Sequence, residues 1–184
     1  MTVLASRSQL RASLLRYALV TVPLVLLLGT LSGRMSGSGD GNAWFDALVK
    51  PEAMPPGWTF AVVWPLLYIM IGFALALILA ARGARGRGVA AGFFIVQLIL
   101  NYAWSPLFFA YHRPSAALVL LLAIIVLSVV TTMLFWKIRK PAGVLMLPYL
   151  AWLFFAGWLN YQIVELNPGA DTLVPHEASA DIAL

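Results

Sequence analysis

The residues of this sequence that could do chemistry are mostly aromatic and amide side chains inside apolar runs. Seven Trp, six Tyr and ten Phe occur among the 184 residues. In the stretch 89–110, four of these polar or aromatic residues recur at the spacing i, i+4, i+7 and i+11: Gln97, Asn101, Trp104 and Phe108. This spacing puts them on one face of a helix. Because an amide in lipid is costly without a partner, this face is expected to point inward.

Two other apolar stretches have comparable faces. One carries Trp64, Tyr68 and Gly72, and the other carries Trp152, Phe155, Ala156 and Leu159. Three such faces could enclose a flat apolar ligand in a site with few polar groups, as small-molecule sites generally have. The alternative for any single Trp is core packing or an interfacial aromatic belt, and a belt explains Trp136 beside Lys137 well.

Ionisable residues are missing from the middle of every apolar run. Asp46 and Glu165 lie at or beyond the membrane edges. Proton pumps and ion-coupled transporters usually bury ionisable groups along their path, and hydrolytic enzymes use acid–base pairs, so both classes are disfavoured. The sequence has no Cys, which excludes disulfides and thiolate metal sites. Its two His, His112 and His176, lie in connecting or tail sequence, which argues against a membrane haem held by two His.

The elements that must position these faces are membrane-spanning helices. The sequence is 62% hydrophobic and 10% charged, against roughly 25% charged in soluble domains. A bilayer core about 30 Å thick needs roughly 20 apolar residues per helix. Five runs qualify, at about 12–31, 59–81, 89–110, 115–136 and 143–165. We therefore expect an all-α integral membrane protein with a five-transmembrane-helix bundle as one domain, 1–166, a first loop at 32–58, and a disordered polar tail at 167–184.

The basic residues predict how the helices are oriented. If five helices alternate, nine Lys and Arg fall on one side and three on the other. The nine are Arg7, Arg11, Arg16, Arg82, Arg85, Arg87, Lys137, Arg139 and Lys140; the three are Arg34, Lys50 and Arg113. The positive-inside rule then places the N-terminus in the cytoplasm and the C-terminus on the opposite side. Short clusters between apolar runs do not form the basic stripe of a nucleic-acid-binding protein. Because three Arg precede the first apolar run, this run has a second interpretation, as a signal peptide rather than a membrane span.

Three long motifs resemble the TspO/MBR family, the tryptophan-rich sensory proteins related to the mitochondrial translocator protein or peripheral-type benzodiazepine receptor. The first comprises W-F-D-A-L-V-K-P at 44–51, P-P-G-W-T-F at 55–60 and V-W-P-L-L-Y at 63–68. The second is Q-L-I-L-N-Y-A-W-S-P-L-F-F at 97–109. The third is P-Y-L-A-W-L-F-F-A at 148–156, followed by L-N-Y at 159–161. The motifs occur in the family's order over about residues 10–166.

The resemblance implies a dimeric five-helix protein of a bacterial cell membrane, with a pocket that opens towards the first loop. It implies a receptor, sensor or carrier for tetrapyrroles such as protoporphyrin IX or haem, or for sterol-like ligands, with no cofactor required. The alternative that it implies is a light-dependent porphyrin-degrading enzyme in which Trp64 and Trp152 take part. By resemblance, Trp44, Pro55, Pro56 and Trp58 belong to a lid. Asn101, Trp104 and Ala156 match pocket positions, and Tyr68, Phe108, Phe155 and Leu159 join them on the inward faces. A purely structural bundle is a third reading, which the aromatic faces make less attractive.

The sequence also departs from the family pattern. Glu52, Ala53 and Met54 stand where a lid aromatic is common, and residues 33–42 resemble an insertion. Trp158 replaces a small or hydroxyl residue, which predicts either a narrower pocket or an altered neighbouring interface. The cholesterol consensus L/V-x-Y-x-K/R, itself a weak pattern, lacks its basic residue, because no Lys or Arg follows Tyr161.

Overall fold

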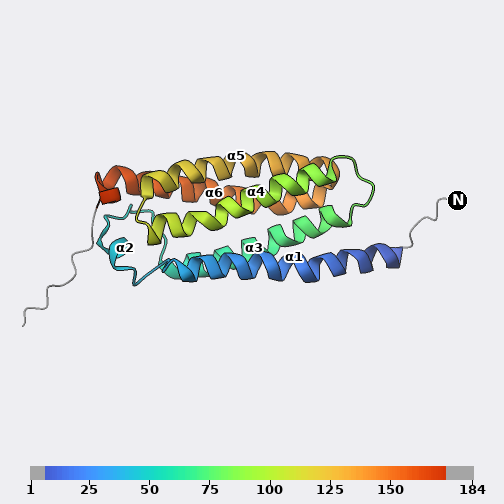
Figure 1. Cartoon of the computed structure of the whole chain (residues 1–184), viewed down its shortest axis with the longest axis horizontal. Helices are drawn as coiled ribbons and strands as arrows, with labels where there is room; N and C mark the ends of the chain where they lie inside the picture. The colour runs from blue at the N-terminus through green and yellow to red at the C-terminus, as the bar shows by residue number, and fades with distance from the viewer. Residues whose placement is uncertain (1–6, 173–184) are drawn as a thin grey trace, which may run out of the picture.

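The computed structural model describes residues 7–172 and consists of an elongated bundle of five long helices (Figure 1). The long helices are α1 (Arg7–Met35), α3 (Gly57–Ala80), α4 (Arg87–Ser105), α5 (Pro114–Ile138) and α6 (Lys140–Leu166). Five segments are long and apolar enough to cross a bilayer, and each has 24 to 28 residues. The expected all-α, five-helix membrane fold is therefore confirmed.

The first and last spans are longer than their apolar cores. The helix expected at 12–31 runs from Arg7 to Met35, and the helix expected at 143–165 runs from Lys140 to Leu166. Polar residues continue each helix into the interfacial region, where apolar composition gives no signal. Hydropathy therefore locates the spans but underestimates helix length.

The third span ends in a wider, π-helical turn, η1 (Pro106–Ala110). The N–H of Tyr111 donates to the Pro106 carbonyl at 3.0 Å, five residues back. Pro106 has no N–H of its own and cannot continue the regular ladder of α4, so the ladder is interrupted there. Together, α4 and η1 cover the span expected at 89–110.

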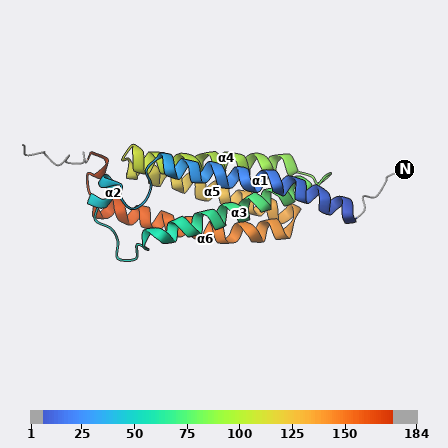
Figure 2. The ribbon, with the colours of Figure 1, turned by 90° about the horizontal axis from the view of Figure 1, so that it is seen from below.

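Helix α1 lies along α3, and α5 lies between α4 and α6 (Figure 2). Gly72 of α3 lets α1 approach closely, because a Cβ at that position would lie 2.9 Å from the Cα of Val22. The Thr21 hydroxyl of α1 donates to the Gly72 carbonyl at 2.8 Å. These contacts build α1 into the bundle and support the interpretation of the first apolar run as a membrane span.

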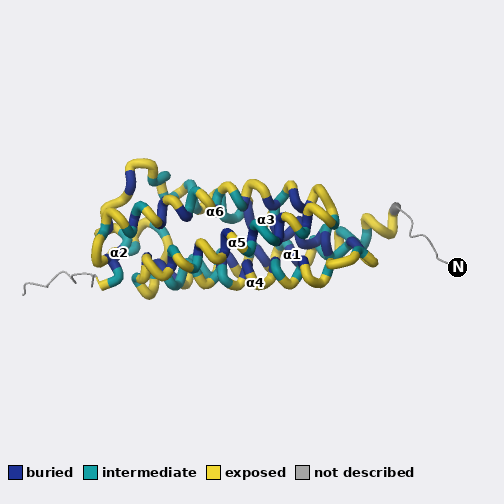
Figure 3. The backbone as a smooth tube through the Cα atoms, turned by 90° about the horizontal axis from the view of Figure 1, so that it is seen from above, coloured by how far each residue is buried: buried dark blue, intermediate teal, exposed yellow. Residues whose placement is uncertain are grey.

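Buried residues line the inside of the bundle and exposed residues form its outer surface (Figure 3). Some of the buried side chains are polar and form hydrogen bonds between helices. Gln97 Oε1 accepts hydrogen bonds from Ser128 Oγ at 3.1 Å and from Tyr149 OH at 2.8 Å. These groups come from α4, α5 and α6, and all three residues are buried. In lipid, such bonds satisfy groups that water cannot reach. The inward orientation predicted for the Gln97 face of α4 is confirmed.

The first loop contains a short helix, α2 (Ala43–Ala47), which lies near the end of α6 (Figure 1). The amide of Asn167 holds this region: its Oδ1 accepts from Val49 N at 2.8 Å, and its Nδ2 donates to Val49 O at 2.9 Å. A 3-10 turn, η2 (Ala170–Thr172), follows. Residues 167–172, expected to open the tail, are thus part of the ordered domain, and the rest of the expected tail, 173–184, lies outside the described residues.

Candidate functional site

An aromatic group lies between α3 and α6. The rings of Trp64 and Trp152 meet edge to face with centroids 6.5 Å apart, and Phe60 contacts Trp152 at 5.6 Å. Both Trp side chains are half-buried against the main core. The two residues singled out for chemistry are therefore brought together, although 88 positions separate them in the chain.

Tyr68 links this group to α4. Its ring lies 5.4 Å from that of Trp64, and its hydroxyl donates to Asn101 Oδ1 at 3.0 Å. A Cβ at Gly29 of α1 would overlap the Tyr68 ring, so this glycine makes the room that the ring occupies. Tyr102 packs on Tyr68 at 5.9 Å. Gly29 and Tyr102 were not among the predicted site residues, because neither repeats on an aromatic face.

Trp104 is held in place by the side-chain amide of Asn160, which is itself bonded to the backbone. Its Nε1 donates to Asn160 Oδ1 at 3.3 Å, and Asn160 Nδ2 donates to the Pro114 carbonyl at 3.0 Å. Its ring stacks on Phe108 with centroids 5.0 Å apart. Asn160 was not predicted as a site residue. An amide within the last span was the available signal, since such a group needs a partner in lipid.

The remaining predicted residues of α6 occupy two different environments. Phe155 touches Trp152 at 5.5 Å, and Ala156 packs against the main core while staying partly exposed. Leu159 is fully covered by the bundle. Trp158 is 44% exposed and stacks on Phe155, so this departure from the family pattern lies on the outer surface of the chain.

The indole nitrogen of Trp152 is buried and has no hydrogen-bond partner within residues 7–172. A buried donor without an acceptor costs about 1–3 kcal/mol. This N–H therefore lies next to half-buried rings as a donor without an acceptor in the described residues. The aromatic group thus combines flat surfaces with one free polar contact, which is the usual composition of a small-molecule site.

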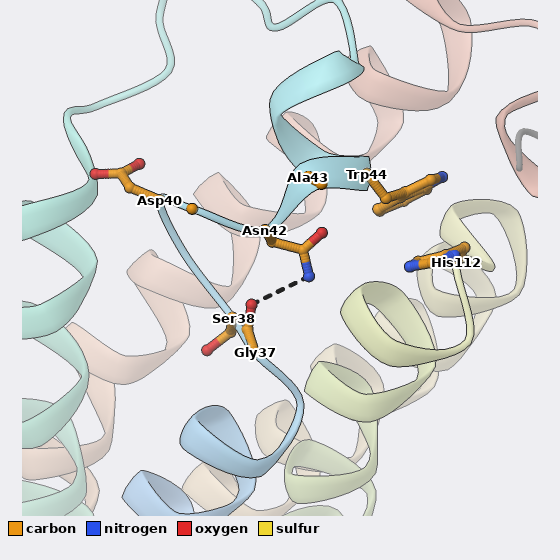
Figure 4. A pocket seen from close by; sticks show the side chains of 8 residues that line it. Gly37, Ser38, Asp40, Asn42, Ala43, Trp44 and His112 are labelled. Atoms are coloured by element: carbon orange, nitrogen blue, oxygen red, sulfur yellow. Dashed lines mark hydrogen bonds between the residues drawn. The ribbon is translucent and has the colours of Figure 1, made fainter. Parts of the chain in front are cut away.

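Trp44 belongs to a separate cluster at the loop end. Its side chain is 2% exposed, stacks on His112 at 4.7 Å and meets Phe108 edge to face at 5.5 Å. His112 has φ of 54°, a conformation rare for residues with a side chain. Beside the stacked pair lies an open cavity of about 490 Å³, shown in Figure 4. Its lining comes from the loop residues Gly37, Ser38, Asp40, Gly41, Asn42 and Ala43, with Trp44 and His112.

The other predicted lid residues lie where the loop enters α3. Pro56 precedes the helix, Pro55 is partly covered, and Trp58 is 67% exposed. Within the described chain, Trp58 makes no ring contact with another aromatic side chain. The apparent insertion reaches the same point, because a Cβ at Gly57 would overlap the Asp40 carboxylate.

The structure therefore divides the thirteen predicted site residues. Five form one connected group: Asn101, Tyr68, Trp64, Trp152 and Phe155. Trp104 and Ala156 pack against the same main core. Trp104 also stacks on Phe108, which contacts Trp44. Leu159 packs within the bundle, and Pro55, Pro56 and Trp58 lie at the rim.

Comparison with known proteins identifies the family. The model of the TspO/MBR family matches residues 20–166. The chain is 40% identical over 126 residues to the tryptophan-rich protein TspO of Chlorobaculum tepidum, covering 68% of this chain and 80% of that protein. It is 38% identical over 142 residues to the translocator protein of Bos taurus, covering 76% and 84%. It is 34% identical over 126 residues to the tryptophan-rich sensory protein of Cereibacter sphaeroides, covering 68% and 78%. This integral membrane protein belongs to the TspO/MBR family.

Proposed function

We propose that this protein is a membrane receptor or carrier that binds a tetrapyrrole, such as protoporphyrin IX or haem, against the aromatic group. The observation that carries the proposal is the half-buried wall of Trp64 and Trp152 with an unpartnered indole N–H. Aromatic faces attract a flat ring system, and the free N–H of Trp152 would donate to a polar atom of the ligand. Relatives named as translocator and sensory proteins support a transport or sensing role.

Replacing Ala156 by Leu tests this site. Ala156 is partly exposed beside Trp152, so a branched side chain there would enter the space that the ligand needs. Overfilling costs about 1–3 kcal/mol, which corresponds to roughly five- to 150-fold weaker binding. Ala123→Leu makes the same change on the exposed surface of α5 and is the matched control. Titration with protoporphyrin IX, followed by quenching of Trp fluorescence, gives both affinities, and equal affinities would contradict the proposal.

Light-dependent degradation of the bound porphyrin is the second candidate. It is favoured by the continuous aromatic contacts from Trp152 through Trp64 to Tyr68. Photo-excited porphyrin would take one electron from a Trp ring and pass it to molecular oxygen, which becomes superoxide. The Trp radical would then regain an electron from the porphyrin, so the net change is oxidation of the porphyrin by oxygen. At saturating protoporphyrin IX, Trp64→Phe and Trp152→Phe should then bind ligand but lose light-dependent bleaching, because Phe is much harder to oxidise. If wild type and both variants bleach at the rate of free porphyrin, this candidate is wrong and the receptor or carrier function stands.

We propose that the N-terminus faces the cytoplasm of a bacterial cell and that the first loop faces the opposite side. The support is the nine-to-three distribution of Lys and Arg and the match to bacterial relatives. A reporter that is active only in the cytoplasm should be silent when fused after Leu184 and active when fused within the 82–88 link. The reverse pattern would overturn the orientation.

We propose that two copies associate through α4. Gly92, Ala103 and Ala110 are exposed on this span, and small residues allow close approach of helices in lipid. Ala90 was expected to contribute but is buried within its own chain. Replacing Ala103 by Phe should abolish a dimer crosslink in native membranes, whereas Ala123→Phe on α5 should leave it. A crosslink that survives Ala103→Phe would move the interface away from α4.

A further inference from the structure

In the described part of the chain, one end of the bundle carries many cations and no side-chain carboxylate. All seven Asp and Glu of the sequence lie in 40–52 or 165–181, which are the first loop and the region from the end of α6 onward. Among the described residues, no anionic side chain therefore lies near the basic residues of the opposite end. Within residues 7–172 the one ion pair, Lys50 with Asp46 at 3.7 Å, is at the loop end. The cations at the basic end are therefore available to anions from outside the protein.

A cavity of about 490 Å³ lies at this basic end, between the first turns of α1 and the end of α3. It is lined by Ser13, Arg16, Tyr17, Val20, Thr21, Leu79 and Arg82. The two guanidinium groups come from different parts of the chain, one from α1 and one from the residues that follow α3. Val20 and Leu79 give the same cavity apolar walls. A ligand that fits this lining has an anionic head and an apolar body.

Two polar details point to a ligand in this cavity. The Ser13 hydroxyl is buried and has no hydrogen-bond partner within the described chain, although its residue lines the cavity. The Thr21 hydroxyl, in contrast, is bonded to the carbonyls of Tyr17 and Gly72 and closes the inner end. Arg87 Nη1 donates to the Leu79 carbonyl at 3.1 Å, which places a third cation beside the apolar wall. The unpartnered Ser13 hydroxyl and the guanidinium groups of Arg16 and Arg82 are all donors, so the cavity suits a ligand that carries hydrogen-bond acceptors.

We propose that this cavity binds the phosphate group of an anionic phospholipid. The phosphate accepts hydrogen bonds from Arg16, Arg82 and the Ser13 hydroxyl, since guanidinium groups match phosphate oxygens well. One acyl chain follows the exposed apolar surface of α1 that includes Leu19 and Val20, which are 74% and 63% exposed. This apolar continuation favours a lipid over a free phosphate ion, and the position at the end of two spans is at headgroup depth.

Native mass spectrometry of the full-length, detergent-purified protein tests the proposal. The probes are dioleoyl phosphatidylglycerol and dioleoyl phosphatidylcholine, which share acyl chains and phosphate but differ in net charge. Phosphatidylglycerol should bind in preference, and Arg16→Gln with Arg82→Gln should weaken it by about thirtyfold, as expected for two cations near a lipid surface. Arg139→Gln with Lys140→Gln removes the same charge from the same end, outside the cavity, and should change affinity by less than about threefold.

Three outcomes would overturn the lipid site. Equal binding of the two lipids would remove the anionic selectivity, and equal losses in the two double variants would indicate general surface attraction. Saturation of the cavity by inorganic phosphate or glycerol phosphate at the affinity of the lipid would make it a free-anion site. Protoporphyrin IX binding, measured on the same samples, should be the same in wild type and both double variants. This readout separates the proposal from the tetrapyrrole site, which lies on α3, α4 and α6.

Discussion

The two ends of the bundle differ in how many of their side chains find partners within the protein. At the loop end, stacked rings, the paired hydrogen bonds between Asn167 and Val49, and a short helix close the structure on itself. At the basic end, the links between helices are short and, in the described residues, the cations have no anionic side chain to pair with. The loop end is therefore closed by contacts within the protein, whereas the basic end leaves its charges open to the surroundings.

This difference has a consequence for the tetrapyrrole site. Trp104 packs against both the main core and the loop-end cluster that contains Phe108 and Trp44. A tetrapyrrole bound as we propose would therefore lie next to the folded loop. The cavity at the other end touches α1 and the end of α3, and α3 also carries Trp64. A lipid bound in that cavity, as we propose, would stabilise a helix of the proposed ligand site without taking part in the chemistry.

The largest loss of stability is expected from truncating the largest buried side chain of the loop end, Trp44. Trp44→Ala removes a fully buried side chain and should lower the free energy of unfolding by about 3–5 kcal/mol. Its indole nitrogen has no hydrogen-bond partner in the described residues, so the loss comes from packing alone. Trp58→Ala removes the same side chain at a 67% exposed position and should change stability by less than about 0.5 kcal/mol. Thermal unfolding in detergent compares the two, and similar losses would show that the loop end does not rest on buried rings.

Binding of an anionic lipid at the basic end should raise the free energy of unfolding of the protein. Adding phosphatidylglycerol at about 100 times its dissociation constant should stabilise the wild-type protein by about 2.7 kcal/mol. At the same lipid concentration, the variant with Arg16→Gln and Arg82→Gln should keep only about 0.9 kcal/mol of this gain, because its binding is about thirtyfold weaker. It should be as stable as wild type in lipid-free detergent, because neither arginine forms an ion pair within the described residues. A variant that is already unstable without lipid would show that these arginines stabilise the bundle internally.

A smaller effect is expected from the amide that joins the loop to the end of α6. Asn167→Ala removes both hydrogen bonds to Val49, which are exposed to solvent, and should cost about 1 kcal/mol. Asn167→Asp keeps the acceptor and loses the donor, so its cost should lie in between. Hydrogen exchange of the Val49 amide is the local measurement. Unchanged protection in Asn167→Ala would show that other contacts hold the loop.

Features that depend on the periodicity and composition of one helix could be predicted from the sequence. Contacts between residues far apart in the chain could not. The five spans and the inward face of Gln97 follow from patterns within one helix. The separation of Trp44 from the group of Trp64 and Trp152 does not, because Trp44 lies in a loop whose position no helical period fixes. Arg16 and Arg82 are 66 positions apart in the sequence and line the same cavity only because α1 packs on α3. Motif resemblance named the residues of the site, but helix packing decides which of them meet.

The smallest effect should come from the ion pair at the loop end. Lys50 pairs with Asp46 at 3.7 Å and lies 4.7 Å from the centroid of the Phe45 ring, but both charged side chains are substantially exposed. Exposed pairs contribute about 0–1 kcal/mol, since water and salt screen them. Lys50→Gln should therefore shift thermal unfolding very little, with an even smaller difference at high salt. A loss above about 2 kcal/mol in the free energy of unfolding would mean that an ion pair rather than stacked rings stabilises the loop end. The loop end and the basic end would then no longer differ in the way that their contacts suggest.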